Sequence, residues 1–249
     1  DNLSAPEIAL PGDNFNTVLY TGNGSTQAIT GIGFRSDLTW VKIRSAAANH
    51  GLFDSIRGVR ASLSSNTTTE SRTAGADQDL YAWGSDGFSV GDSVGDSYIN
   101  TNVDTATYAS WNWKAGGAPT VDNSAGAGAT PTAGSVKIDG SNLGSALAGT
   151  IAAKRLSANT TSGFSIVQYV GTGSGATIAH GLSQAPDMVI SKSMDDAYNW
   201  RVGGEKIGLT SANYSMRMDT DLAEQDLSGV FGAYPGPSVW TIGTDAGVN

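Results

Sequence analysis

Short runs of alternating apolar and polar residues recur along the chain and are separated by glycine-rich turns. Successive side chains of a β-strand point to opposite faces, so such a run buries one face and leaves the other in water. The runs that predict strands are residues 17–20, 38–43, 87–90 and 106–113. The last run places Ala109, Trp111 and Trp113 on one face. Many short strands joined by glycine-rich turns predict an all-β fold of the sandwich or jelly-roll type.

The two halves of the chain carry related sequences. Residues 20–25 read Tyr-Thr-Gly-Asn-Gly-Ser, and residues 169–174 read Tyr-Val-Gly-Thr-Gly-Ser. Further pairs follow in the same order at nearly constant spacing: 37–42 with 187–192, 49–50 with 199–200, and 87–91 with 239–243. Self-similarity at one spacing is the signature of a repeated structural unit. The sequence therefore predicts two tandem β-sandwich modules.

We place the first module at residues 14–114 and the second at residues 163–249. The segment between them, residues 115–162, is predicted to be a Gly/Ala/Ser-rich linker, because 115–135 has too few large apolar residues to bury a core. Within it, residues 141–148 carry leucines at helical spacing, which predicts a short helix.

The second module lacks a counterpart for the last strand of the first. Residues 103–114 close the first copy with an aromatic run, whereas the second copy reaches Asn249 at the point that matches residues 100–102. An open sandwich leaves unpaired backbone groups and an apolar face. We expect either that the natural chain continues with this strand, which we favour, or that a neighbouring subunit donates it.

Composition narrows the possible functions. The 249 residues carry a net charge of −9, and the 14 Lys and Arg residues are scattered, which argues against a nucleic-acid-binding surface. The absence of cysteine from the sequence excludes disulfides, zinc–cysteine sites and thiol nucleophiles. No apolar run is long enough to span a bilayer as a helix, so membrane insertion is not expected.

Histidines and acidic residues are the candidate metal ligands. His50 and His180 lie in comparable loops without suitably spaced partners, so a packing role is favoured for both. The acidic groups are Asp86, Asp92, Asp96 and Asp104; Asp195 and Asp196; and Asp219 and Asp221. Calcium binds oxygen ligands of this kind, but no EF-hand or nonapeptide repeat is present, and Asp is common in turns. A turn role is favoured over a bound cation, and no cofactor or metal site is expected.

A surface-polysaccharide depolymerase would need two carboxylates at the scissile bond. The candidates are Asp54, Glu70, Glu205 and Glu224, and no pair among them is distinguished by its context. We therefore expect no catalytic residues and no enzymatic activity.

Aromatic residues are the candidates for glycan binding. Trp40, Trp83, Trp111 and Trp113 fall within strand-like runs and are expected in the core. Tyr198, Trp200 and Tyr234 lie in or near loops, where an exposed ring can stack on a sugar. Because tryptophan in sandwiches is usually largely buried, packing is the favoured role for these residues as well.

Several segments together resemble a module of tail fibres and other virion appendages of tailed phages, many of them marine. They are residues 15–26, 52–58, 63–66, 85–88, 111–117, 157–167, 179–182 and 185–187. The second copy departs from the pattern, because Arg201 to Gly208 lacks the Phe-Asp-Ser-x-Arg-Gly core found at residues 53–58.

The resemblance implies a structural protein on the surface of a virion: a tail-fibre, spike or capsid-fibre subunit. Its expected partners are other virion proteins and further copies of itself, with a trimer as the usual arrangement in phage fibres. The family supplies no catalytic residues to carry over. Recognition of host surface glycans, as a binding module, and the depolymerase described above are the alternatives.

Overall fold

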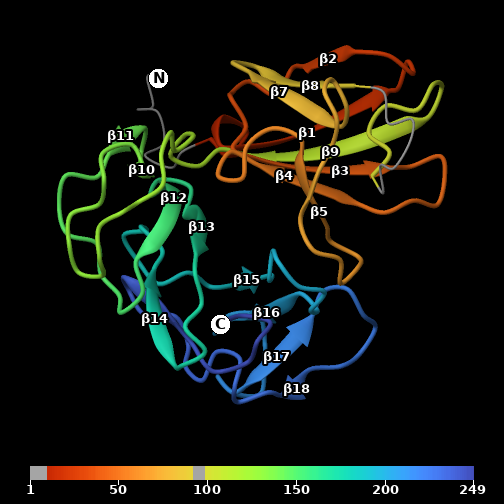
Figure 1. Cartoon of the computed structure of the whole chain (residues 1–249). Helices are drawn as coiled ribbons and strands as arrows, with labels where there is room; N and C mark the ends of the chain where they lie inside the picture. The colour runs from red at the N-terminus through yellow and green to blue at the C-terminus, as the bar shows by residue number, and fades with distance from the viewer. Residues whose placement is uncertain (1–9, 92–98) are drawn as a thin grey trace, which may run out of the picture.

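The computed structural model describes residues 10–91 and 99–249 (Figure 1). These residues form nineteen strands and one turn of 3-10 helix, η1 (Pro11–Asp13). No helix in the described ranges is long and apolar enough to cross a membrane. The predicted all-β fold of two tandem sandwich modules is confirmed.

The first module is a sandwich of two antiparallel sheets. One sheet has the strand order β1 (Phe15–Thr21), β9 (Thr107–Trp113), β3 (Leu38–Ile43), β4 (Gly51–Asp54), β5 (Ala61–Ser64) and β6 (Arg72–Thr73). The other has the order β2 (Gln27–Thr30), β8 (Gly87–Val90) and β7 (Leu80–Gly84). The core between them is built mainly from Ile29, Ile32, Phe34, Val41, Ile43, Phe53, Leu80, Phe88, Val90 and Tyr108.

Strand β9 is the central element of the first module. It runs antiparallel to β1 on one side and to β3 on the other. Its inward side chains, Tyr108, Ser110 and Asn112, are fully buried. The ring of Tyr108 stacks on Tyr20 of β1, with 4.8 Å between centroids. The last strand of the module in the sequence therefore lies between β1 and β3 in the sheet and fills the centre of the core.

The four tryptophans expected in the core are half-buried at its margins instead: Trp40, Trp83, Trp111 and Trp113. The reason is visible on β3 and β9, whose adjacent inward positions hold Thr39 and Asn112, joined by a hydrogen bond of 3.1 Å. Because side chains alternate along a strand, Trp40 and Trp111 then point to the outer face. There they pack against each other, with ring centroids 5.9 Å apart.

The second module repeats the order of the first. Its strands are β13 (Phe164–Tyr169), β14 (Ala176–Ala179), β15 (Val189–Ser191), β16 (Arg201–Gly203), β17 (Tyr214–Arg217), β18 (Gln225–Asp226) and β19 (Val239–Ile242). Strands β15 to β18 form one sheet in sequence order, and β14 pairs with β19 as β2 pairs with β8. The core is built from Ile151, Ala176, Ile178, Val230, Phe231, Trp240, Ile242 and Val248.

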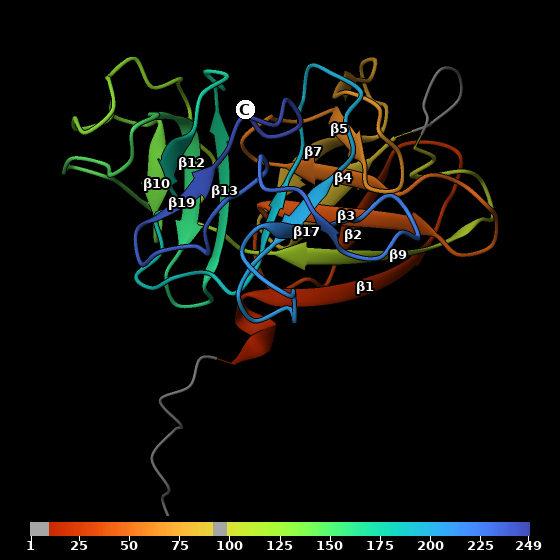
Figure 2. The same ribbon diagram turned by 90° about the horizontal axis from the view of Figure 1, so that it is seen from below.

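The predicted linker is wrong over its second half. That half forms β10 (Val136–Ile138), β11 (Ser141–Asn142) and β12 (Ala153–Asn159), which join β13 in a sheet of order β11-β10-β12-β13. This sheet has its own small core of Val136, Leu147, Ala153, Leu156, Ala158 and Ala179. Figures 1 and 2 show that it lies beside the first module and does not act as an extended spacer.

The predicted helix over residues 141–148 is also wrong. Asp139 and Gly140 both have positive φ, of 50° and 85°, and Ile138 pairs directly with Ser141. Two central residues with positive φ make the tight turn typical of a two-residue β-hairpin. The turn sets a strand pairing at Ser141, and Leu147 packs into the small core without a helix.

The second module has no counterpart of β9 among residues 10–91 and 99–249. Strand β13 is the last strand of one sheet and β15 is the first strand of another. In the first module the corresponding strands, β1 and β3, are joined through β9. The sheet that is continuous in the first module is thus interrupted in the second.

Candidate binding surfaces

Trp200 is buried at the joint between the two modules. Its side chain packs with Leu52 and Leu63 of the first module and is only 6% exposed. The indole Nε1 donates a hydrogen bond of 2.8 Å to the carbonyl oxygen of Ser64. The packing role favoured for Trp200 is therefore confirmed, and the alternative, an exposed ring for a sugar, is wrong.

Further contacts fix the position of the second module. The ring of Trp113, at the end of β9, stacks on Phe164, at the start of β13, with centroids 6.0 Å apart. Arg155 of β12 donates from Nη1 to the carbonyl oxygen of Ile56 at 2.8 Å. These contacts join segments that are distant in the sequence, so the joint is a packed interface.

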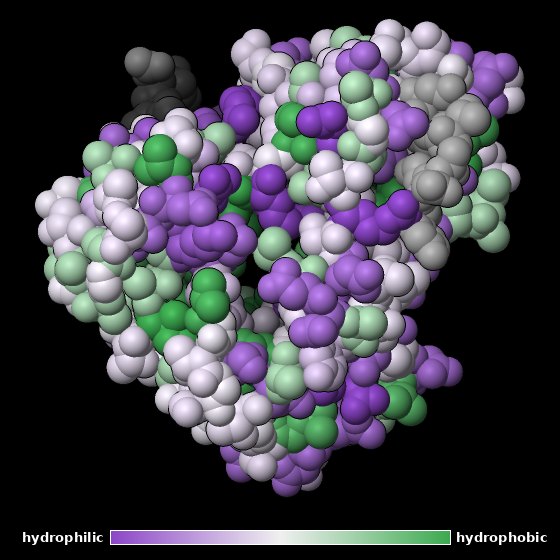
Figure 3. All heavy atoms as spheres, viewed as in Figure 1, coloured by the Kyte–Doolittle hydropathy of each residue, from purple (hydrophilic) through white to green (hydrophobic). Residues whose placement is uncertain are grey.

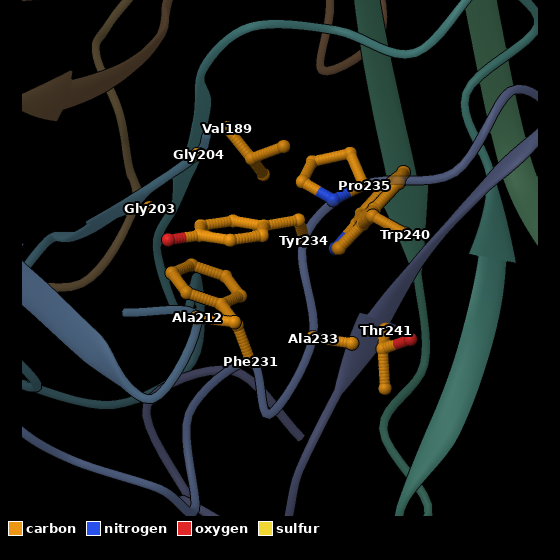
Figure 4. A pocket seen from close by; sticks show the side chains of 10 residues that line it. All are labelled: Val189, Gly203, Gly204, Ala212, Phe231, Ala233, Tyr234, Pro235, Trp240 and Thr241. Atoms are coloured by element: carbon orange, nitrogen blue, oxygen red, sulfur yellow. The ribbon is translucent and has the colours of Figure 1, made fainter. Parts of the chain in front are cut away.

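Tyr234 lines a small pocket in the second module, with a volume of about 10 Å³, room for about one water molecule (Figure 4). The lining residues are Val189, Gly203, Gly204, Ala212, Phe231, Ala233, Tyr234, Pro235, Trp240 and Thr241. In Figure 4 the rings of Tyr234 and Phe231 lie next to each other. Trp240 is 7% exposed, and its Nε1 has no hydrogen-bond partner within the described part of the chain. None of the lining residues carries a carboxylate, so the pocket offers mainly apolar contact and no acid–base pair.

The third aromatic candidate, Tyr198, is 41% exposed and lies outside this pocket. The structure thus gives the three predicted residues different surroundings: a joint for Trp200, a pocket for Tyr234 and the surface for Tyr198. Sugar stacking on Tyr198 or Tyr234 stays a prediction.

The two histidines have packing contacts. The Nδ1 atom of His180 accepts a hydrogen bond of 3.1 Å from the backbone N–H of Leu182, so the ring proton is on Nε2 and is donated to the carbonyl oxygen of Gly236 at 3.1 Å. Burial lowers the pKa of His180. His50 lies against Trp40, and partial burial together with the charge of Lys42 lowers its pKa.

The acidic groups do not converge on a cation site in the part of the chain that the structure describes. The carboxylate of Asp86 accepts the backbone N–H groups of Gly31 and Gly33, at 3.1 Å and 2.5 Å, and these bonds lower its pKa. Asp219 accepts from the side chain of Asn199 and the backbone N–H of Trp200. Asp92 and Asp96 lie outside the described residues.

Three of the four candidate carboxylates have structural contacts. Asp54 forms a buried ion pair of 2.6 Å with Arg57 and accepts two backbone N–H groups. Glu224 binds the backbone and side chain of Thr210, which lowers its pKa. Glu205 lies 3.8 Å from Lys206, and Glu70 is exposed.

Both halves of the chain match a single sequence family. The family is described as a domain of unknown function, DUF7483, and the matches span residues 10–139 and 132–249. The chain belongs to this family, in two copies. The second DUF7483 match begins at residue 132 and therefore includes β10 to β12. No curated protein and no solved structure matches the chain.

The two DUF7483 modules differ where the second lacks the Phe-Asp-Ser-x-Arg-Gly core. Gly203 replaces Phe53, and a Cβ on Gly203 would lie 2.4 Å from the ring of Phe231. The ring of Phe231 thus occupies space next to the backbone that a side chain at residue 203 would need. Sequence reasoning missed Phe231 and Trp240 as pocket residues, although the loss of a large side chain at Gly203 is a readable signal.

Proposed function

We propose that the protein is a non-catalytic structural subunit of a phage virion appendage: a tail fibre, spike or capsid fibre. The observation that carries the proposal is the packed joint between two modules of one family. A fibre must transmit force without its modules swinging apart, and burial of a shared aromatic residue provides that rigidity. The resemblance of the sequence to virion appendage modules supports the same role.

The proposal includes assembly with copies of itself and with other virion proteins on the particle surface. Closed symmetry is the rule for homo-oligomers, and a trimer is the arrangement we propose by analogy with phage fibres. The low content of charged residues, 15%, suits repeated packing of copies along a fibre.

Immunogold electron microscopy tests this role directly. Antibodies raised against the full chain are applied to intact phage particles whose genome encodes the protein, with pre-immune serum as the control. We expect gold at one type of appendage or at capsid fibres. Gold confined to soluble lysate, with none on purified particles, would contradict the proposal.

A second candidate function is binding of a host surface glycan, and the pocket beside Tyr234 favours it. The pocket is too small to enclose a sugar, so the contact we propose is stacking of one sugar face on the half-buried ring of Tyr234. On a glycan array, Tyr234→Ala should abolish binding, whereas Tyr198→Ala, outside the pocket, should leave it unchanged. An array on which the unaltered protein binds nothing would exclude this candidate.

A further inference from the structure

The second module contains a slot between two unpaired strand edges, and this slot exists whether or not the protein belongs to a virion. Strand β13 pairs only with β12, and β15 pairs only with β16, among the residues that the structure describes. In Figure 1 no strand is drawn between β13 and β15. Figure 3, in the same view, shows the surface hollowed at this place, with hydrophobic atoms at its margin.

By analogy with β1 and β3, which flank β9 in the first module, we expect the slot to have the width of one strand. Val167 and Tyr169 of β13 and Val189 of β15 pack on the same core, as Val18 and Tyr20 of β1 and Val41 of β3 do in the first module. The Tyr169 hydroxyl reaches to 3.4 Å from Ser191 Oγ, which bridges the slot by a single side chain. Neighbouring strands lie about 4.8 Å apart, so strands that flank one missing strand are about 9.6 Å apart.

Asn249 makes the same contacts in the second module that Asn102, just before β9, makes in the first. Asn102 binds the turn after β1 by accepting the backbone N–H of Asn23 at 3.1 Å and donating to the carbonyl oxygen of Ser25. Asn249 accepts the backbone N–H of Thr172 at 2.6 Å and donates to Ser174, in the same two ways.

The backbone of residue 249 passes the turn after β13 as closely as the backbone of residue 102 passes the turn after β1. A Cβ on Gly22 would lie 3.0 Å from the carbonyl carbon of Asn102, and a Cβ on Gly171 would lie 2.4 Å from that of Asn249. The two glycines allow the same close approach of the chain. In the first module the next strand along this path is β9.

A buried carboxylate receives the end of β9 in the first module. Asp37 Oδ2 accepts the backbone N–H groups of Ala115 and Gly117, at 2.9 Å and 3.1 Å, and Asp37 is 2% exposed. Its counterpart in the second module, Asp187, is exposed and has no hydrogen bond to its carboxylate within the described ranges. The acceptor at the far end of the slot is thus also in place.

Apolar side chains on β15 and just before it are exposed beside the slot. Met188 is 49% exposed and Ile190 is 43% exposed. Their counterparts on β3, Leu38 and Trp40, are half-buried: they lie beside Trp113 and Trp111 of β9 and also pack on the Leu52, Leu63 and Trp200 cluster. A strand in the slot would cover Met188 and Ile190 in the same way.

We infer that the slot between β13 and β15 is an acceptor site for one extended peptide strand of the β9 type, running antiparallel to both edges. Strand addition of this kind gains affinity from main-chain hydrogen bonds and specificity from alternate side chains. The register of β9 places its Ser110 position between Val167 and Ser191, and its Trp111 position beside Ile190. The strand that fits has polar residues facing inward, as Tyr108, Ser110 and Asn112 do in β9, and large apolar residues facing outward.

The β9 strand of a second folded copy is not the occupant, because β9 is already paired on both edges. The occupant is a segment that is extended and unpaired before it binds. This requirement distinguishes strand addition from ordinary dimer formation between two folded chains.

A synthetic peptide with the sequence of residues 103–114, labelled with fluorescein, serves as the probe for the full-length protein. We expect saturable one-to-one binding by fluorescence anisotropy and new hydrogen-exchange protection in β13 and β15. Ile190→Asp should weaken binding by about tenfold or more, because it places a charge beside the outward face of the strand. The matched control is Leu19→Asp on β1, a more exposed strand residue outside the slot, which should not change the affinity.

A peptide with proline at the positions of Ala109 and Ser110 should fail to bind, because proline cannot donate to a strand ladder. Fusing residues 103–114 directly after Asn249 should raise the melting temperature and abolish binding of the free peptide. Three results would overturn the inference: no saturable binding up to about 1 mM, protection outside β13 and β15, or self-association that protects both edges without peptide. The last result would identify a second copy as the occupant. None of these results bears on the particle labelling that tests the proposed function.

Discussion

Truncation of Trp200 should destabilise the protein more than any other single change at the joint. An aromatic side chain buries about 150–250 Å², which at about 25 cal/mol per Å² corresponds to about 4–6 kcal/mol. Trp→Ala substitutions in well-packed sites cost about 3–5 kcal/mol, which is consistent with that value. We therefore expect Trp200→Ala to lower the free energy of unfolding by about 3–5 kcal/mol. Trp200→Phe keeps most of the ring but loses the bond to Ser64, and should cost about 1 kcal/mol beyond the lost area.

Urea denaturation followed by circular dichroism measures both variants. Tyr198→Ala, two residues away at an exposed position, is the control and should change the free energy by less than about 0.5 kcal/mol. A double-mutant cycle with Leu63→Ala should give a coupling energy of about 0.5–3 kcal/mol, because the two side chains touch across the joint. If Trp200→Ala unfolds within about 0.5 kcal/mol of the parent, or if the coupling is zero, the modules are not held together by this residue.

Three further predictions follow from individual contacts. Asp37→Ala should cost about 3 kcal/mol in urea denaturation, because it leaves buried N–H groups unpaired, whereas Asp187→Ala at the exposed counterpart should be neutral. Burial lowers the pKa of His180 in the folded state, so at acidic pH the unfolded chain binds a proton that the folded chain does not. Stability should therefore fall as the pH drops below about 6.5. A pH series of melting curves in which His180→Gln leaves that slope unchanged would refute this. Gly116→Ala should lower the free energy of unfolding by about 2 kcal/mol or more, because the added Cβ would lie 2.4 Å from a backbone oxygen. Gly126→Ala is the control, because its Cβ would meet nothing within 4 Å, and it should not destabilise the protein. Equal melting temperatures for the two variants would contradict the packing of this segment.

The sequence predicted the elements whose signal is local. Alternation located the strand over residues 38–43, which the structure reproduces as β3, and the strand over 87–90, which is β8. The repeated Tyr-x-Gly-x-Gly-Ser motif located the turn after β1 and its counterpart after β13. In each case a short run of residues contains the information, because pleat and turn geometry are set by neighbours in the chain.

The elements that sequence reasoning placed wrongly depend on distant partners. Strand β12 pairs with β10 and β13, and its own sequence has no β-branched residue and no regular alternation that would predict a strand. Trp200 stands in a loop-like sequence and becomes buried only because Leu52 and Leu63 lie opposite it in the folded chain. The hairpin at Asp139-Gly140 is different, because an Asp-Gly pair between apolar runs is a turn signal that outweighs the leucine spacing after it.

Hydrogen exchange on the full chain without added peptide most directly tests the central claim, that the second module repeats the first without its central strand. Strand β3 has neighbours on both edges, so all its backbone N–H groups should exchange slowly. Strands β13 and β15 each have one neighbour, so slow and fast exchange should alternate along them. Uniformly slow exchange along both β13 and β15, equal to that of β3, would contradict the claim.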